Sequence, residues 1–162
     1  MKKRIYLSLG ANMGDRLANL RNAIQGLREV GDLVAQSSMY ETEPVDVDPA
    51  QSWFLNCAIV LETELSPREL LDKILAMELA MGRVRSQKRG PRPVDIDIIF
   101  FADEVIDQPG LTIPHPAMQS RRFVLAPLAE IAPGVIHPLL KRSVQELLDD
   151  LPKSSGEVRK LI

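Results

Sequence analysis

The order in which strand and helix patterns follow one another is the feature that most constrains the fold of this chain. Six predicted elements occupy the first 101 residues, in the order strand, helix, strand, strand, helix, strand. The strands are predicted at 4–9, 33–42, 53–63 and 94–101, and the helices between Asp15 and Gly31 and between Ser66 and Gly82. This order is that of the split β-α-β unit of ferredoxin-like folds. The sequence therefore predicts an α+β domain with a ferredoxin-like βαββαβ core and a mainly antiparallel sheet.

Both predicted helices carry recognisable start signals. Asp15 can cap the first helix. The second opens with Ser66, Pro67 and Glu69, where serine caps, proline suits the first helical position and glutamate completes a capping box. Gly82 stands where a glycine commonly ends a helix. The expected buried stripes are Leu17, Leu20, Ile24 and Leu27 in the first helix and Leu70, Leu71, Ile74, Leu75 and Leu79 in the second.

The last third of the chain predicts additional C-terminal elements. They are helical segments near 117–131 and 143–150 and an edge strand at 158–162. Ser143 and Glu146 can form another capping box. No repeat, linker or low-complexity segment interrupts the sequence, so we expect residues 1–162 to form a single domain.

The composition and charge exclude several classes of protein. The net charge is −2, so the molecule is not a polycation that binds long nucleic acids. A single cysteine, Cys57, rules out an internal disulfide and fits a reducing compartment. The apolar segment after Arg4 alternates like a strand rather than a signal peptide, and no apolar run reaches membrane-spanning length. We therefore expect a cytoplasmic monomer that binds small molecules, with no nucleic acid or membrane partner.

The segment from Gly82 to Phe101 contains the charged side chains that indicate a function. Its first half contains five cationic side chains without an intervening acid, namely Arg83, Arg85, Lys88, Arg89 and Arg92. Asp95 and Asp97 follow on a predicted strand, where residues two apart share one face. Carboxylates suit Mg²⁺, which usually binds together with substrate phosphates, and guanidinium groups bind phosphate oxygens through paired hydrogen bonds. The segment therefore predicts nucleotide and Mg²⁺ binding and a phosphoryl-type transfer.

The residues alone leave plainer interpretations open. An isolated Asp-x-Asp pair is more often the solvated face of an edge strand than a metal site. The basic run could be a solvated loop or an RNA-binding patch, although adjoining carboxylates would repel RNA. Phe123 lies among apolar residues and could belong to the core, Glu78 on pattern alone would be a surface acid, and His137 would be structural. A non-catalytic binding module and a kinase that moves only the γ-phosphoryl group are the alternative functions.

Five motifs occur in order between residue 5 and Pro133. They are Leu7-Ser8-Leu9-Gly10-Ala11-Asn12 with Gly14-Asp15, Tyr40-Glu41-Thr42-Glu43-Pro44, GRVR…RGPRPVDIDI, Ile113-Pro114-His115-Pro116, and Arg121-Arg122-Phe123-Val124-Leu125-Ala126-Pro127-Leu128. In this combination the chain resembles the 6-hydroxymethyl-7,8-dihydropterin pyrophosphokinase family. The resemblance implies a ferredoxin-like fold and transfer of the β,γ-pyrophosphoryl group of ATP to the hydroxymethyl oxygen of the dihydropterin. AMP would be released, in folate biosynthesis, with ATP as co-substrate and two Mg²⁺ ions as cofactors.

The resemblance also implies roles for individual residues. Asp95 and Asp97 would hold the two Mg²⁺ ions, and Arg83 and Arg92 would stabilise the transferring group, so these four are the implied catalytic residues. The implied ATP-binding residues are Glu78, Arg85, Arg89, Ile98, Thr112, His115 and Arg121. The implied pterin-binding residues are Thr42, Pro44, Phe54, Asn56 and Phe123, with the two phenylalanines on either side of the ring.

Two rings are adjacent where the pterin is implied to bind. Trp53 and Phe54 follow one another, and alternation along a strand places them on opposite faces. Phe54 shares its face with Asn56. We therefore expect Phe54, rather than Trp53, to stack on the pterin.

Overall fold

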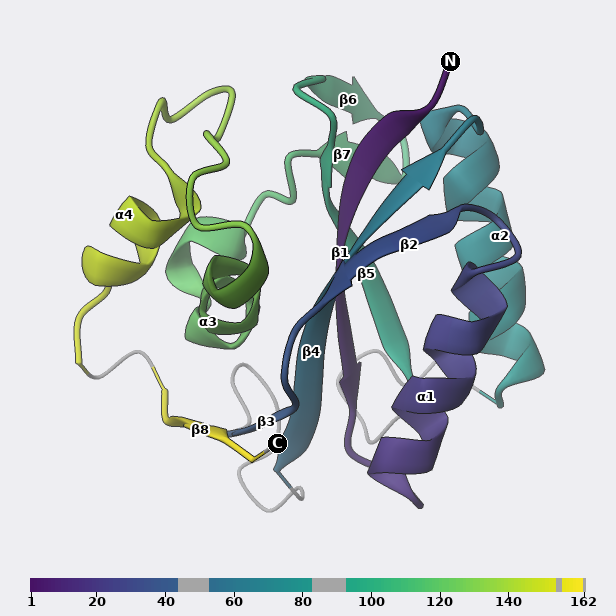
Figure 1. Cartoon of the computed structure of the whole chain (residues 1–162), viewed down its shortest axis with the longest axis horizontal. Helices are drawn as coiled ribbons and strands as arrows, with labels where there is room; N and C mark the ends of the chain where they lie inside the picture. The colour runs from purple at the N-terminus through teal and green to yellow at the C-terminus, as the bar shows by residue number, and fades with distance from the viewer. Residues whose placement is uncertain (44–52, 83–92, 154–155, 162) are drawn as a thin grey trace.

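A computed structural model describes residues 1–43, 53–82, 93–153 and 156–161 of the chain. The strands are β1 (Lys3–Ala11), β2 (Asp32–Gln36), β3 (Tyr40–Thr42), β4 (Phe54–Thr63), β5 (Asp95–Phe101), β6 (Ile106–Gln108), β7 (Leu111–Ile113) and β8 (Val158–Lys160). The helices are α1 (Arg16–Leu27), α2 (Pro67–Ala80), α3 (Arg122–Ile131) and α4 (Val144–Asp149), with a 3-10 turn at Met118–Ser120. Figure 1 shows the main sheet between two helical layers.

The main sheet has the strand order β5-β1-β4-β3-β8, and β2 pairs with β4 next to β3. All the described strand pairs in it are antiparallel. The elements follow the predicted order of strand, helix, strand, strand, helix, strand, with helices added after β5. The predicted fold class, a ferredoxin-like α+β core with C-terminal helices, is therefore confirmed.

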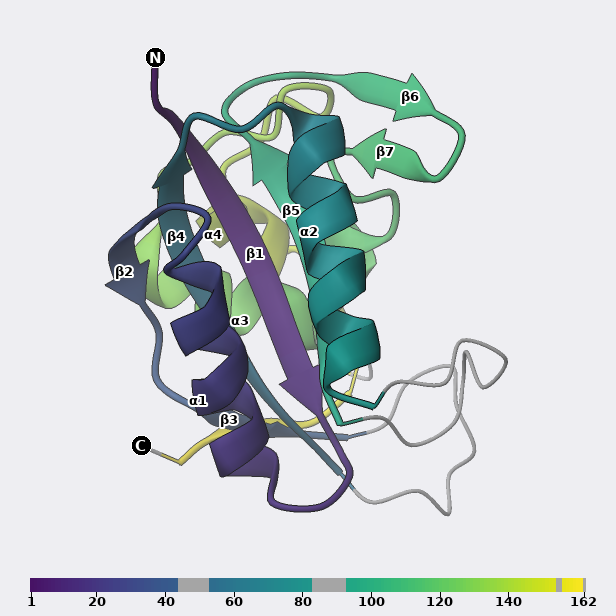
Figure 2. The same ribbon diagram turned by 90° about the vertical axis from the view of Figure 1, so that its right-hand side faces the viewer.

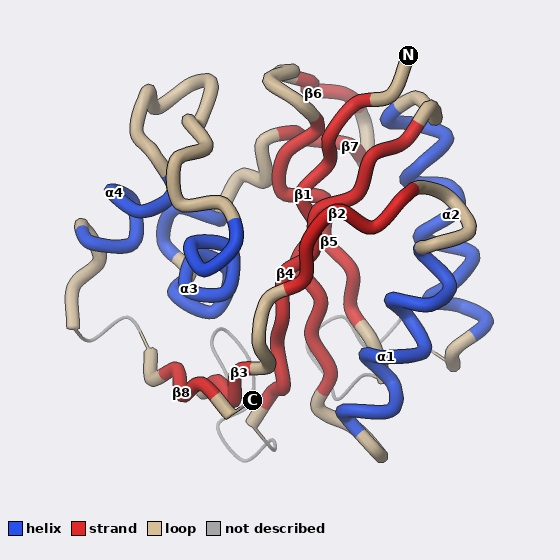
Figure 3. Tube along the Cα trace, viewed as in Figure 1, coloured by secondary structure: helices blue, strands red, loops and turns tan. Residues whose placement is uncertain are grey.

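The prediction of one strand at 33–42 is wrong, because this segment divides into β2 and β3 with a short loop between them (Figure 3). Ser37 lies at the break. Its N–H donates to the carbonyl of Ala58 at 2.9 Å, and its Oγ accepts from the N–H of Ala58 at 2.8 Å. The side-chain oxygen thus replaces a main-chain carbonyl in the ladder. The next N–H, that of Ser38, donates to the carboxylate of Glu130 on α3. These two side-chain contacts, at Ser37 and at Ser38, interrupt the strand.

Two apolar cores lie on opposite faces of the sheet. Helices α1 and α2 cover one face (Figure 2), and α3 and α4 cover the other (Figure 1). The first core includes Leu9, Leu20, Leu27, Ile59 and Ile74, and the second includes Tyr6, Phe100, Val124, Leu125 and Leu128. Because side chains alternate along a strand, neighbours in sequence face different helical layers. We call the two sides the α1/α2 face and the α3 face.

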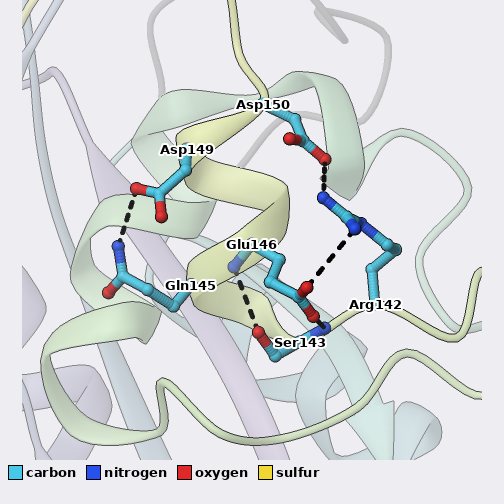
Figure 4. A network of polar contacts seen from close by, with 6 residues as sticks. All are labelled: Arg142, Ser143, Gln145, Glu146, Asp149 and Asp150. Atoms are coloured by element: carbon cyan, nitrogen blue, oxygen red, sulfur yellow. Dashed lines mark hydrogen bonds and ion pairs between the residues drawn. The ribbon is translucent and has the colours of Figure 1, made fainter.

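The helix starts agree with the predicted capping signals. The Asp15 side chain accepts a hydrogen bond from a backbone N–H in the first turn of α1, at 3.1 Å. Ser66 and Glu69 form a reciprocal capping box at the start of α2. Figure 4 shows the same arrangement in α4, where Ser143 and Glu146 cap one another's backbone. Each box satisfies two backbone N–H groups that no helical carbonyl can reach.

Two details of the helices differ from the prediction. Helix α1 ends at Leu27 rather than at Gly31. Leu79 is wrong as a buried residue, since it is 53% exposed, whereas its neighbour Glu78 is only 5% exposed. Positions 70, 74 and 78 are spaced four apart and lie along one side of the helix, so the glutamate occupies the last inward position.

The segment after β5 contains a small hairpin that the sequence pattern did not predict. Strands β6 and β7 pair with one another, outside the main sheet, and β7 contacts β5. The predicted C-terminal edge strand is confirmed as β8, which pairs with β3. None of the helices in the described ranges is long and apolar enough to cross a membrane.

Candidate active site

Polar side chains form a row across the α3 face near one end of the sheet. Gly10 of β1 pairs with Asp95 of β5 on one side and with Asn56 of β4 on the other. Ile96 packs in the core under α1 and α2, so Asp95 and Asp97 share the α3 face, as predicted. Both aspartates are half-buried. The fold therefore places the predicted metal ligands one strand away from the predicted pterin-binding asparagine.

Gly10 occupies the centre of this row because there is no room for a side chain. An added Cβ would lie 2.6 Å from Nδ2 of Asn56 and 3.5 Å from the ring of Phe54. The first of these distances is shorter than any normal contact, so a larger residue would displace the asparagine amide. Gly10 thus leaves open the surface between the carboxylates and the asparagine.

Asn56 is held in one orientation by two neighbours. Its Oδ1 accepts a hydrogen bond from the hydroxyl of Thr42, and its Nδ2 donates to the carbonyl of Leu9 at 3.3 Å. Asn56 and Thr42 are both buried. Strands β3 and β4 also pair Thr42 with Phe54. An aromatic ring and a fixed amide therefore meet at the start of β4, which suits a flat heteroaromatic ligand with a polar edge.

The adjacent rings of Trp53 and Phe54 lie on opposite faces of the sheet, as the alternation of side chains along a strand predicted. Leu55 packs under α1 and α2, so Phe54 and Asn56 share the α3 face. Trp53 lies beneath the guanidinium of Arg159, which is 4.6 Å from the centre of its ring. The expectation that Phe54 shares its face with the asparagine is confirmed.

Three predicted residues lie in the first turn of α3 or on the segment that leads into it. The guanidinium of Arg121 lies 5.6 Å from the centre of the Phe123 ring, and Phe123 itself is half-buried at the margin of the core under α3. Nδ1 of His115 accepts from the N–H of Ala117 at 3.2 Å. Burial lowers the pKa of His115, Arg121 lowers it further, and Asp95 opposes the shift. The imidazole is therefore neutral near pH 7, carries its proton on Nε2, and lies within electrostatic reach of the aspartate.

Glu78 reaches the same strand from the opposite face. Its Oε2 accepts a hydrogen bond from the backbone N–H of Ile96 at 2.8 Å. The interpretation of Glu78 as a surface acid is wrong, because α2 buries this side chain against β5. The contact fixes the main chain between Asp95 and Asp97.

A model of the family described as 7,8-dihydro-6-hydroxymethylpterin-pyrophosphokinase (HPPK) matches residues 6–133. The chain belongs to the HPPK family. It is 41% identical over 156 residues to the 2-amino-4-hydroxy-6-hydroxymethyldihydropteridine pyrophosphokinase of Methylorubrum extorquens, covering 95% of this chain and 97% of that protein. The protein of the same name from Aquifex aeolicus is 41% identical over 142 residues, which are 88% of each chain.

Longer proteins also contain an HPPK-like region. The folic acid synthesis protein FOL1 of Dictyostelium discoideum is 40% identical over 152 residues, which are 94% of this chain but only 23% of that protein. A solved structure of wild-type Plasmodium falciparum HPPK-DHPS with SDX-DHP superposes with a TM-score of 0.75 over 92% of this chain and 44% of that one. Its sequence identity is 17%, so it supports the fold alone.

Two residues with implied HPPK roles lie away from the polar row. The side chain of Ile98 is buried in the core under α1 and α2, on the other face of β5 from Asp95 and Asp97. The structure therefore does not bring this side chain to the aspartates, although its main chain follows directly after them. Thr112 is exposed on β7, in the hairpin that contacts β5.

The remaining predicted HPPK residues lie outside the described ranges. They are Arg83, Arg85, Arg89, Arg92 and Pro44. The four arginines stand in the sequence between Gly82, which follows α2, and Pro93, which precedes β5. Within the described residues, no three His, Cys, Asp or Glu side chains gather in a way that could hold a metal ion by themselves.

Sequence reasoning missed two parts of this HPPK site. The first is the spatial role of Gly10, for which an isolated glycine in an apolar strand pattern is the available signal. The second is a group of contacts around Trp53. Its carbonyl accepts from Nη1 of Arg16 at 2.8 Å, and Nη2 of Arg16 pairs with Glu41 at 3.0 Å. These contacts join residues far apart in the chain, and no local pattern indicates them.

Proposed function

We propose that this protein transfers the pyrophosphoryl group of ATP to the hydroxymethyl oxygen of 6-hydroxymethyl-7,8-dihydropterin and releases AMP, as a step of folate biosynthesis. One observation carries the proposal beyond the family match. Gly10 pairs with both Asp95 and Asn56, so a single residue without a side chain lies between the first carboxylate and the fixed amide. A phosphate-side group and a pterin-side group can therefore approach each other across Gly10.

Asp95 and Asp97 would bind Mg²⁺ in this proposal. Mg²⁺ commonly binds to one or two carboxylates and completes its coordination with phosphate and water oxygens. Two carboxylates on one face of a strand fit that donor set, and they are both accessible from the α3 face. When bound, two Mg²⁺ ions would neutralise charge on the polyphosphate.

The pterin would bind between Phe54 and Phe123. The fixed amide of Asn56 supports this, because it can read hydrogen-bonding groups at the edge of a ring that the phenylalanines hold by its faces. Thr42 orients that amide, and Pro44 would contribute from outside the described residues. Phe54 rather than Trp53 is the stacking residue, since it lies on the face of the asparagine.

ATP would bind on the side of β5. His115 and Arg121 support this placement, because the N–H of His115 donates to the carbonyl of Ile99 on β5 at 3.1 Å and Arg121 follows His115 by six residues. The neutral imidazole offers Nε2–H as a donor, and the guanidinium offers positive charge. The other nucleotide-binding residues in the proposal are Glu78, Ile98 through its main chain, Thr112, Arg85 and Arg89.

The chemical step depends mainly on positioning and charge. A primary alcohol is a weak nucleophile, and phosphoryl-type transfer requires in-line alignment and stabilisation of charge more than covalent catalysis. The rigid sheet supplies alignment, since Asp95, Gly10 and Asn56 lie on three paired strands. Arg83 and Arg92 would stabilise the charge on the transferring group.

The test is product analysis by phosphorus NMR after incubation with ATP, Mg²⁺ and the hydroxymethyl dihydropterin. We expect equal amounts of AMP and a pterin diphosphate, and loss of both products when EDTA replaces Mg²⁺. ADP as the first product, with adenylate kinase excluded, would identify a kinase of the γ-phosphoryl group. Binding of both ligands without ATP consumption would identify a non-catalytic module. Either result would overturn the proposal.

A further inference from the structure

The C-terminal segment contacts residues on both sides of the stretch 44–52, which lies outside the described residues. On one side, the N–H of Glu43 donates to the carbonyl of Glu157 at 3.0 Å. The N–H of Glu157 in turn donates to Oε1 of Glu43 at 3.3 Å. Strand β8 then continues along β3, so that Val158 pairs with Thr42. Figure 1 shows β8 beside β3 at the edge of the sheet.

On the other side, the same segment holds Trp53. The guanidinium of Arg159 lies over the indole, 4.6 Å from the ring centre, and Nε of Arg159 also pairs with Glu157 at 3.3 Å. Arg16 of α1 donates to the carbonyl of Trp53 and pairs with Glu41, which lies opposite Arg159 in the register of β3 and β8. Two elements from opposite ends of the chain, α1 and β8, therefore contact Trp53, and Glu41 of β3 pairs with the arginine from α1.

These contacts lie on the opposite face of the sheet from the pterin-side groups. Phe54 follows Trp53 directly, and successive strand residues point to opposite faces. Immobilising the indole on one face therefore restricts the main chain that presents the Phe54 ring on the other. Thr42 is placed in the same way, because it pairs with Phe54 on one side and with Val158 on the other.

We infer that β8 positions the pterin side of the active site and that Arg159 does so through Trp53. Arg159 is a positioning residue in this scheme, since it contacts Trp53 and not the substrate. The inference rests on the proposed function, because it names the substrate whose binding β8 supports. The ATP side depends on β5 and the segment leading into α3, which β8 does not pair with.

The test compares steady-state kinetics of Arg159→Ala with those of the unaltered protein, with the pterin and ATP varied separately. An exposed cation–π contact corresponds to about a two- to five-fold change in an equilibrium constant. We expect the KM for the pterin to rise by about that factor, with the KM for ATP unchanged and circular dichroism the same. Arg159→Lys keeps a cation but loses the planar stack and should fall between the two.

Two controls separate positioning from a general effect. Arg142→Ala removes another exposed arginine, which pairs with Glu146 of α4 and with Asp150 at its end (Figure 4), and should leave both KM values unchanged. In a Trp53→Ala background, Arg159→Ala should add nothing, because its partner is gone.

An unchanged pterin KM in Arg159→Ala, or an equal rise in the KM for ATP, would overturn the inference. So would an additive effect of the two substitutions. These outcomes differ from failure of the proposed function, which would appear as absence of AMP and pterin diphosphate with the unaltered protein.

Discussion

The carboxylate of Glu78 accepts a hydrogen bond from the backbone N–H of Ile96, with 2.8 Å between Oε2 and N. Ile96 lies between Asp95 and Asp97, so this contact connects the last turn of α2 to the part of β5 that carries both acids. The bond is buried, which makes it costly to leave the N–H without an acceptor. The inward glutamate thus fixes the part of β5 that carries both acids.

Replacing Glu78 by leucine should therefore destabilise the protein. Leucine fills part of the volume but leaves the Ile96 N–H without this acceptor, at a cost of about 1–3 kcal/mol in the free energy of unfolding. Glu78→Gln keeps an acceptor oxygen and should lose less. Urea unfolding of the two variants measures the difference. Equal stability of Glu78→Leu and the unaltered protein would contradict this account.

Substituting Gly10 by alanine should impair the pterin side of the site. The new Cβ would meet Nδ2 of Asn56 at 2.6 Å, so the amide must move away from its present contacts. We expect the Kd for the pterin to rise about ten-fold or more, which is about 1.4 kcal/mol, with a smaller effect on ATP. Titration calorimetry with each ligand tests this. Gly134→Ala is the control, because nothing lies within 4 Å of a Cβ there.

Local patterns predicted most of the fold. The cap signals at Asp15 and Ser66 mark where α1 and α2 start, because capping depends on residues within one turn. The break between β2 and β3 was not predictable in this way, because Ser37 interrupts the strand by bonding to Ala58 on β4. The inward position of Glu78 likewise depends on an N–H that only the folded sheet presents.

The site was predictable to a different degree. Alternation along a strand was enough to place Asp95 with Asp97 and Phe54 with Asn56, since it needs no knowledge of partners. The pairing of Gly10 with Asp95 on β5 and with Asn56 on β4 was not predictable without knowing the order of the strands in the sheet. Contacts such as Arg159 over Trp53 join residues more than a hundred positions apart, and composition alone gives no reason to expect them.

Removing either carboxylate should abolish turnover and leave the fold intact. Asp95→Asn and Asp97→Asn keep the shape of the side chain but remove the charge that would hold Mg²⁺. We expect activity to fall by about a hundred-fold or more, as for loss of a group that stabilises transition-state charge. Both variants should remain folded, because asparagine keeps the size of the side chain, and circular dichroism checks this. Asp107→Asn on exposed β6 is the matched control, and near-normal activity of either site variant would refute the metal assignment.

The two stacking residues should affect the pterin alone. Phe54→Ala and Phe123→Ala each remove a ring whose stacking contributes about 0.5–1.5 kcal/mol beyond its burial. We expect each to raise the Kd for the pterin by about ten-fold, with binding of a non-hydrolysable ATP analogue unchanged. Trp53→Ala should have a smaller effect, because this ring lies on the opposite face. A larger effect of Trp53→Ala than of Phe54→Ala in titration calorimetry would reverse their roles.

His137 should make the stability of the protein depend on pH. Its Nδ1 accepts from the N–H groups of Leu139 and Leu140, both at 3.1 Å, and burial lowers its pKa below the usual 6.5. The folded protein therefore holds a neutral ring, while the unfolded chain takes up a proton as the pH falls below 6.5. The stabilisation is present above that pH and is lost as the pH falls toward the lower folded pKa.

His137→Asn offers Oδ1 in place of Nδ1 and cannot take up a proton there, so its free energy of unfolding should change less between about pH 7 and about pH 5. Part of the dependence should persist, because burial also lowers the pKa of His115. Urea unfolding at several pH values decides the matter, and an identical pH dependence in the variant would show that His137 does not contribute.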